Sequence, residues 1–345
     1  MVLSAVVVAV VALGVAMGSD RRSDTRDAPA GTRSAGVGGG SDPVATRRPR
    51  CDRVLGRRAD VADFVDSLRA GRTGCLRRGV HRATDVVSID APKVTLTSRS
   101  ARPATIVGRV SVSAEADGAR IENLKLDGRN ELGKPSPTIN ANKVILRGND
   151  ITNRHTTICV SITDYSGEPP PRGVVIADNV IHDCGELPAT NHHHGIYVSH
   201  ARDTVIRNNV IYGNADRGVQ LYPDADDSIV TGNVIDGNGQ GVIFGGGPDS
   251  SSDDNLVAGN VITGSNIRWN IQSHWQGPVG SGNVARDNCV WTTNVEYPGL
   301  PPGSGIEPEM VGARAFDNVV ADPVRPRRGC AAAAKAGTAL RSPSP

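Results

Sequence analysis

The feature that most constrains the fold of this chain is a repeated frame centred on asparagine. In each copy the asparagine follows one apolar residue by three positions and precedes another by two. The six asparagines are Asn149, Asn179, Asn209, Asn233, Asn260 and Asn288, and successive members are 30, 30, 24, 27 and 28 positions apart. Self-similarity at a period of a few tens of residues is typical of solenoid proteins. The frame therefore predicts a repeat fold whose loops vary in length while its coil is kept.

Short segments with a two-residue hydrophobic period accompany the frame and predict β-strands. They are rich in β-branched residues and are interrupted by Gly, Asp and Pro, as in residues 86–89, 94–96, 106–112 and 121–126. In the later coils a second strand follows each asparagine, for example at residues 195–199. Strands that recur in the same order in every coil must stack in parallel. We therefore predict an all-β chain folded as a parallel β-helix solenoid.

Stacked coils would give the asparagines a structural role. An amide side chain both donates and accepts, so asparagines about 4.8 Å apart can form a ladder of hydrogen bonds at a corner of the solenoid. Alternatively, each asparagine adopts the left-handed backbone conformation that this residue tolerates. Both interpretations assign the six asparagines to the scaffold and remove them from the search for a functional site.

The N-terminal segment has the pattern of an export signal. Residues 2–17 are an apolar run that is short for a membrane span of about 20 residues and suits the hydrophobic region of a signal peptide. A small-x-small cleavage site follows at Ala16 to Gly18, although no Lys or Arg precedes the run. We expect export, with residues 1–18 either cleaved or retained as an N-terminal anchor. Residues 19–50 are mostly Gly, Ser, Pro, Arg and Asp, which predicts a disordered linker.

A short amphipathic helix is predicted before the first coil. Asp60 is a suitable N-cap, apolar residues follow at positions 61, 64, 65 and 68, and Gly71 is a stop signal. Such a helix would cover the open strand edges at the end of a solenoid. We assign residues 51–85 to this cap, residues 86–320 to the β-helix and residues 321–345 to a C-terminal tail.

Six cysteines in an exported chain predict disulfides. Fifteen pairings are possible, and proximity in sequence favours three of them. No Cys-x-x-Cys pair occurs, which argues against a structural zinc site. The favoured pairs are Cys51 with Cys75, Cys159 with Cys184, and Cys289 with Cys330.

The charge balance argues against a nucleic-acid partner. The formal net charge is only +2, and the basic residues are scattered along the chain instead of forming a stripe with interleaved aromatic residues. The excess of Arg over Lys, together with abundant Ala, Gly and Val, is explained by genomic base composition. We expect a monomer.

The asparagine-centred repeats, the capping helix and the disulfide-compatible context resemble the right-handed parallel β-helix superfamily. That superfamily includes pectate lyases, polygalacturonases, chondroitinase B-type lyases and mannuronan C5-epimerases. The resemblance covers residues 86–291, and residues 193–199 followed by 205–209 are similar to the central coils of bacterial mannuronan epimerases and related alginate enzymes. It implies a right-handed coil and an extracellular or cell-wall polysaccharide as partner. The Asp-Pro-His-Asp stretch of the epimerases is absent. The Arg-x-Lys of polygalacturonases is also absent, which disfavours hydrolysis by paired carboxylates.

Alternation along residues 195–199 predicts which side chains face outward. Ile196 and Val198 should point into the core and Tyr197 outward. The repeat register then stacks Tyr197 with Gln220, Ile243 and Gln272, and stacks Ser199 with Tyr222 and His274. The expected catalytic residues on this face are His194, Tyr197, His200, Arg217 and Tyr222, and the expected substrate contacts are Gln220, Gln240, His274 and Trp275.

These residue types suit the removal of a C5 proton from a uronic acid. The reaction needs a base near neutrality, such as His194 or His200, and a proton donor, such as Tyr197 or Tyr222. A cation such as Arg217 would stabilise the carboxylate as it gains enolate character. The hypothesis is a polysaccharide lyase or uronate C5-epimerase. The alternatives are a non-catalytic carbohydrate-binding module, a structural repeat protein, and merely solvated surface side chains.

Two acidic loops are candidate Ca²⁺ sites, because carboxylate oxygens are the ligands that Ca²⁺ prefers. The first contains Asp224, Asp226 and Asp227, and the second contains Asp249, Asp253 and Asp254. Asp-rich loops between strands are more often simple turns. The sequence indicates no other cofactor. Trp269, Trp275 and Trp291 are candidates for stacking on sugar rings or for packing under the C-terminal end.

Overall fold

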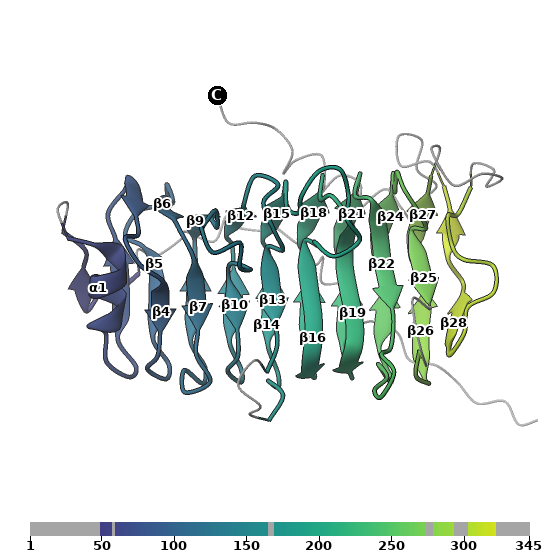
Figure 1. Cartoon of the computed structure of the whole chain (residues 1–345), viewed down its shortest axis with the longest axis horizontal. Coiled ribbons are helices and arrows are strands. Elements are labelled where there is room, and N and C mark those ends of the chain that lie inside the picture. Colours follow the sequence, from purple (N-terminus) through teal and green to yellow (C-terminus); the bar gives the residue numbers. More distant parts are fainter. Residues whose placement is uncertain (1–48, 57–58, 165–168, 274–278, 293–302, 322–345) are drawn as a thin grey trace, which may run out of the picture. The chain divides into compact units, whose positions relative to one another are not determined.

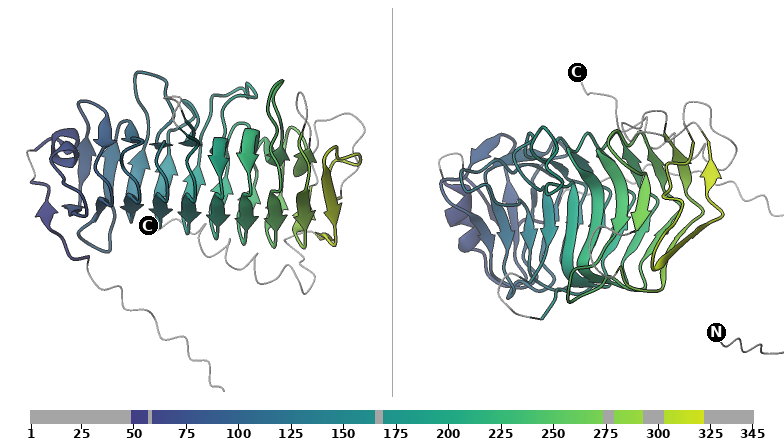
Figure 2. Two further views of the ribbon diagram at one scale, coloured as in Figure 1. Left: turned by 90° about the horizontal axis from the view of Figure 1, so that it is seen from below. Right: turned by 45° about the vertical axis from the view of Figure 1, so that its right-hand side comes forward.

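Stacked coils form a parallel β-helix in the part of the chain that the computed structural model describes, residues 49–56, 59–164, 169–273, 279–292 and 303–321. Each regular coil contributes one strand to each of three sheets, and the coils follow one another in sequence order (Figures 1 and 2). The predicted fold class is confirmed. The residues predicted as signal peptide or anchor, 1–18, and those of the linker up to residue 48 lie outside the described part of the chain.

The three sheets are named here in the order in which a coil visits them. Sheet A contains β1 (Arg53–Val54), β2 (Thr73–Leu76), β5 (Thr95–Ser98), β8 (Arg120–Glu122), β11 (Ile145–Arg147), β14 (Val175–Ala177), β17 (Val205–Arg207), β20 (Ile229–Thr231), β23 (Leu256–Ala258), β26 (Asn283–Arg286) and β28 (Ala313–Phe316). Sheet B contains β3 (Val80–Arg82), β6 (Ala104–Val107), β9 (Leu124–Asp127), β12 (Asp150–Thr152), β15 (Val180–His182), β18 (Val210–Tyr212), β21 (Val234–Asp236), β24 (Val261–Thr263), β27 (Cys289–Trp291) and β29 (Val319–Val320). Sheet C contains β4 (Val87–Ile89), β7 (Val110–Val112), β10 (Thr138–Ile139), β13 (Val160–Ile162), β16 (Ile196–Arg202), β19 (Arg217–Asp226), β22 (Gln240–Phe244) and β25 (Ile271–Ser273).

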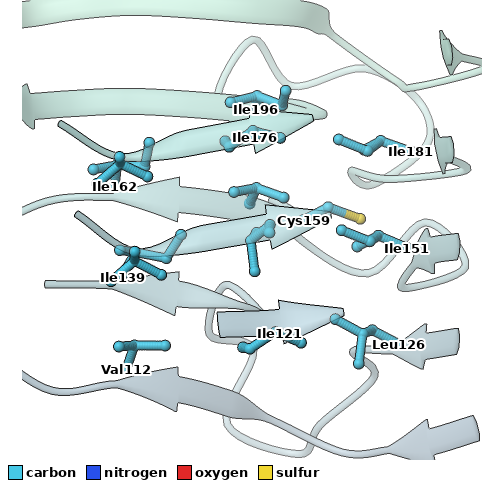
Figure 3. Packing of buried hydrophobic residues seen from close by; sticks show 14 of the residues in the cluster. Val112, Ile121, Leu126, Ile139, Ile151, Cys159, Ile162, Ile176, Ile181 and Ile196 are labelled. Atoms are coloured by element: carbon cyan, nitrogen blue, oxygen red, sulfur yellow. The ribbon is translucent and has the colours of Figure 1, made fainter. Parts of the chain in front are cut away.

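Aliphatic side chains stack coil upon coil inside the three sheets. In sheet B, Leu126 is paired with Ile151 of the next coil, and Ile151 is paired with Ile181 of the coil after that. Sheet C stacks Val112 and Ile139 in the same way (Figure 3). These side chains are buried, and complete burial of a residue of this size contributes about 1.5–3 kcal/mol. The alternation of apolar residues in the sequence follows from this packing.

The asparagine frame forms the predicted ladder at the corner between sheets A and B. Nδ2 of Asn179 donates to Oδ1 of Asn209 at 2.9 Å, and the same bond recurs from each asparagine of the frame to the next. Asn318 continues the ladder as a rung that the frame did not predict, because Asn288 donates to it at 2.9 Å. The residue before the asparagine adopts the left-handed conformation, as Asp178 does with φ 58°. The ladder interpretation is therefore confirmed, and the left-handed conformation belongs to the preceding residue.

The predicted cap helix is present as α1 (Val61–Asp66), with the Asp60 carboxylate accepting from the main-chain nitrogen of Ala62 at 2.7 Å. Phe64 and Val65 are buried. The helix ends five residues before Gly71, with Ser67 as its C-cap. Strands β1 to β3 already belong to sheets A and B, so the coils begin before the predicted boundary at residue 86. The difference arises because the helix lies within the first coil and not ahead of it.

Two of the three predicted disulfides are formed. Cys51 is bonded to Cys75 and Cys159 to Cys184, with Cα–Cα distances of 5.7 and 5.6 Å. Cys289 is also disulfide-bonded. Its predicted partner Cys330 lies outside the described residues, so that pairing stays a prediction. Among the described residues no helix has the length and apolar character that a membrane span requires.

Candidate functional site at the corner between sheets B and C

The candidate site lies where the chain turns from sheet B into sheet C, along the top of the view in Figure 1. One long connection, residues 183–195 between β15 and β16, is called the corner loop. Its residues Pro188, Ala189 and Asn191 line a cavity of about 230 Å³ together with residues from the following coils. Those residues include Asp216, Arg217, Gln240 and Arg268. The corner loop therefore covers the start of β19 and β22.

The predicted register of sheet C is confirmed at the start of its central strands. Tyr197 pairs with Gln220, Gln220 with Ile243, and Ile243 with Gln272. Arg217 pairs with Gln240 as expected. Ile196 and Val198 lie in the core, as the alternation predicts.

The column expected for Ser199 and Tyr222 falls where the register between β16 and β19 shifts. Val198 pairs with Leu221, but His200 pairs with Asp224, so β19 holds one extra residue. A β-bulge of this kind shifts the side chains that follow it. His200, in β16, also lies six residues after His194, which is about 20 Å at the rise of a strand. The structure therefore brings His194, Tyr197 and Arg217 together near the start of β16. His200 lies near the other end of that strand.

Arg217 is the central residue of the group that it forms with His194 and Tyr197. Its side chain is 1% exposed. Nη2 donates to Oδ1 of Asn191 at 2.7 Å, and Nη1 donates to the main-chain oxygen of the same residue at 3.0 Å. Burial lowers the pKa of Arg217 to about 10, and the neighbouring Arg268 acts in the same direction. The guanidinium therefore stays charged at neutral pH.

A second guanidinium converges on the same oxygen. Nη1 of Arg268 donates to Oδ1 of Asn191 at 2.7 Å. The carboxylate of Asp216 holds the corner loop in place, because it accepts from the main-chain nitrogens of Asn191 at 2.8 Å and His193 at 2.9 Å. Two cationic side chains thus meet at one uncharged amide oxygen.

His194 lies next to this pair and is 3% exposed. Burial is the main cause that holds the pKa of His194 well below its ordinary value of 6.5, and the positive charge of Arg217 acts in the same direction. Its Nδ1 has no hydrogen-bond partner within the described part of the chain. The ring meets Tyr197 edge to face, with centroids 5.6 Å apart. A neutral imidazole and a phenol therefore lie side by side, and the interpretation of solvated surface side chains fails for His194 and Arg217.

A chain of amide side chains extends the site toward the next coils. Nε2 of Gln240 donates to Oε1 of Gln272 at 2.5 Å, and Gln272 donates to Glu307 at 3.1 Å. These glutamines are buried. The predicted contacts His274 and Trp275 lie outside the described residues.

The other predicted residues have different surroundings. Oγ of Ser199 lies 2.9 Å from Nδ1 of His200, and that nitrogen is 3.4 Å from Asp164. Tyr222 is half-buried at the bulge of β19. These groups form a second polar cluster in sheet C.

An arginine forms ion pairs with two aspartates of the first acidic loop. Arg202 lies 2.8 Å from the carboxylate of Asp224 and 3.1 Å from that of Asp226. Asp227 is exposed. No group of three or more potential metal ligands occurs among the described residues. This arrangement favours ion pairing over Ca²⁺ binding at these aspartates.

Sequence patterns did not reveal Asn191, Asp216, Arg268 or Glu307. Asp216 directly precedes Arg217, the first residue of β19, and this position is the signal that the sequence offers for it. The other three reach the site from loops whose paths the asparagine frame does not determine.

The fold of the described residues is a right-handed parallel β-helix that carries a buried cationic corner. The family model described as right handed beta helix region matches residues 138–274. Comparison with curated protein sequences gave no significant match.

Solved structures of similar fold include an endo-xylogalacturonan hydrolase from Aspergillus tubingensis, with 12% identity, a TM-score of 0.56, and coverage of 75% of this chain and 88% of that one. An alginate lyase from Paenibacillus has 14% identity, a TM-score of 0.44, and coverage of 77% and 99%. A mannuronan C-5 epimerase module from Azotobacter vinelandii has 14% identity, a TM-score of 0.42, and coverage of 76% and 91%. At these identities the similarities show the fold alone.

Proposed function

We propose that this protein acts on a uronic-acid polysaccharide at the corner loop, as a lyase or a C5-epimerase. The observation that carries the proposal is the convergence of Arg217 and Arg268 on Oδ1 of Asn191, each at 2.7 Å. A carboxylate in that place would receive charge-assisted hydrogen bonds, which are roughly twice as strong as those to a neutral acceptor. The carboxylate of a uronic acid is such a group, and it would replace Asn191 when the corner loop opens.

The neighbouring side chains supply the remaining chemistry. Neutral His194 removes the C5 proton, and Arg217 stabilises the negative charge that develops on the substrate carboxylate. In the lyase reaction the electron pair of the C5–H bond forms a C4–C5 double bond, the C4–O bond breaks, and Tyr197 gives its proton to the leaving oxygen. In the epimerase reaction Tyr197 returns a proton to C5 from the opposite face, and no bond to oxygen breaks.

Burial of His194 makes opening of the corner loop a required step. The ring is 3% exposed, so a sugar reaches it only after residues 183–195 move. The hydrogen bonds that hold Asn191 must therefore break before a sugar can reach His194. The substrate carboxylate and Asn191 of the closed corner loop compete for the same two guanidinium groups.

The same burial favours one other function. If the corner loop stays closed, the fold serves as a non-catalytic carbohydrate-binding module and the arginine pair is structural. Such a module would bind polysaccharide without changing it, and a substitution at His194 would affect stability alone.

Export belongs to the same proposal. Two disulfides in the described residues agree with an oxidising compartment outside the cytoplasm. The substrate would then be an extracellular or cell-wall polysaccharide, reached through the signal or anchor at residues 1–18.

Incubation with alginate, pectate and glycosaminoglycans tests the proposal, with ultraviolet absorbance reporting unsaturated product and NMR reporting inverted C5 centres. Alanine at His194 and phenylalanine at Tyr197 should each remove the activity found. Tyr212→Phe, in sheet B, is the matched control and should retain it. Full turnover by either site variant would refute the assigned roles.

A further inference from the structure

A second cavity lies at the same corner of the solenoid, nearer the N-terminal end. It has a volume of about 470 Å³. Three arginines, Arg82, Arg109 and Arg129, line it together with the main chain around residues 83–86 and 107–108. Like the corner loop, these segments lie where the chain leaves sheet B or enters sheet C.

The arginines of this cavity differ in how their charge is compensated. Arg129 pairs with the Asp127 carboxylate at 2.7 Å, and Arg154 shares that carboxylate at 3.2 Å. Arg109 differs, because its Nε is buried without a hydrogen-bond partner in the described part of the chain. A buried donor without an acceptor costs about 1–3 kcal/mol, and more when the group is charged. An anion in the cavity would provide the missing acceptor.

The acidic groups at this cavity do not fill that role. Asp85 and Glu131 also line it, yet no carboxylate of the described residues lies within 4.0 Å of a nitrogen of Arg82 or Arg109. Arg82 and Glu131 are exposed. The cavity therefore holds a cationic group, Arg109, that is partly withdrawn from water and not neutralised.

Position along the solenoid connects this cavity with the first site. Strands β19 and β7 are four places apart in sheet C, in the order β19, β16, β13, β10 and β7 (Figure 1). At about 4.8 Å for each strand the separation is about 19 Å. A linear polymer that runs parallel to the solenoid axis would pass both cavities along one corner.

We propose that the cavity around Arg109 binds an acidic group, carboxylate or sulfate, of a polysaccharide chain that lies along the corner between sheets B and C. The bound chain extends from this cavity toward Arg217. The direction of the chain rests on the proposed function at Arg217, whereas anion binding at Arg109 does not. The cavity would make binding depend on polymer length, because short fragments reach only one of the two cavities.

Binding of fluorescent oligosaccharides to the full chain tests this proposal, with oligogalacturonate, oligomannuronate and chondroitin sulfate as probes. Each is used as a disaccharide and as a chain long enough to span both cavities. The double variant Arg82→Gln/Arg109→Gln should weaken binding of a long chain by about tenfold, the loss of one charged hydrogen bond, and leave disaccharide binding at the Arg217 site unchanged. Arg102→Gln, an exposed arginine at the turn from sheet A to sheet B, is the matched control.

The outcomes distinguish anion binding at Arg109 from catalysis at Arg217. Wild-type affinity of the double variant for every long chain would overturn the proposal, and so would the absence of binding of any probe to the wild-type protein. Circular dichroism must show that the double variant is folded. Length-dependent binding that needs Arg109, found without any turnover, would support the cavity and reject catalysis at Arg217. A preference for chondroitin sulfate over unsulfated chondroitin would identify sulfate as the group bound.

Discussion

Asn191 accepts two hydrogen bonds from the buried guanidinium of Arg217, one on its side-chain oxygen at 2.7 Å and one on its main-chain oxygen at 3.0 Å. An anion is the strongest acceptor for a buried arginine, whereas the acceptor of these two hydrogen bonds is a neutral residue of a loop. The relationship is therefore suited to exchange. Under the proposed function, a ligand carboxylate would form stronger hydrogen bonds with Arg217 than Asn191 does, and it would displace the corner loop.

Asn191→Asp should lock the corner loop. A carboxylate at this position forms charge-assisted hydrogen bonds with Arg217 and Arg268, so thermal stability should rise while KM for a polyuronate increases about tenfold. Differential scanning calorimetry and steady-state kinetics measure the two effects. Thr190→Asp, which adds the same charge at an exposed neighbouring position, should change neither. A lower KM in Asn191→Asp would show that Asn191 does not compete with substrate.

The acid limb of the activity profile should lie below pH 6.5. Because burial and the charge of Arg217 lower the pKa of His194 in the folded protein, the ring remains neutral and able to accept a proton where an ordinary histidine is already charged. The measurement is kcat/KM against pH for whichever polyuronate is turned over. A limb with its midpoint above 6.5 would assign the base to another group.

Protonation of His182 should stabilise the folded protein. Burial acts to lower its pKa, but hydrogen bonds with Asp150 at 3.0 Å and Asp183 at 2.8 Å outweigh burial and raise it. A raised folded-state pKa adds stability that is fully present below pH 6.5 and disappears as pH rises through the folded value. His182→Gln should therefore lower the melting temperature mainly in acid. His81→Gln, in β3 of the same sheet, is the control, and a loss in His182→Gln that is equal at all pH values would contradict the ion pairs.

The asparagine ladder should contribute strongly to the free energy of unfolding. Asn209→Ala removes hydrogen bonds to Asn179, Asn233 and the main-chain oxygen of Ile176, all at 2.9 Å. Leaving several buried groups without partners should cost about 3–5 kcal/mol, measured by urea unfolding. The neighbouring Asn208 is exposed with φ 55°, so Asn208→Gly should be nearly neutral. A small loss in Asn209→Ala would mean that water replaces the ladder.

The sequence pattern was sufficient for the scaffold because each coil repeats the same local requirements. The spacing of Asn179 and Asn209 determines the turn between sheets A and B, and through it the register that places Tyr197 beside Gln220. The site depends on residues outside that register. The bulge at Tyr222 and the path of the loop that carries Asn191 arise from packing between coils, for which a single-coil pattern has no signal.

The most direct test of the central claim is exchange of the C5 proton in heavy water. Both proposed reactions begin with its removal, so wild-type protein incubated with alginate or pectate should place deuterium at C5 or form the C4–C5 double bond, read by NMR. His194→Gln should do neither. If the wild-type protein binds these polymers and leaves every C5 proton in place with no unsaturated product, the corner is a binding site and the catalytic account is wrong.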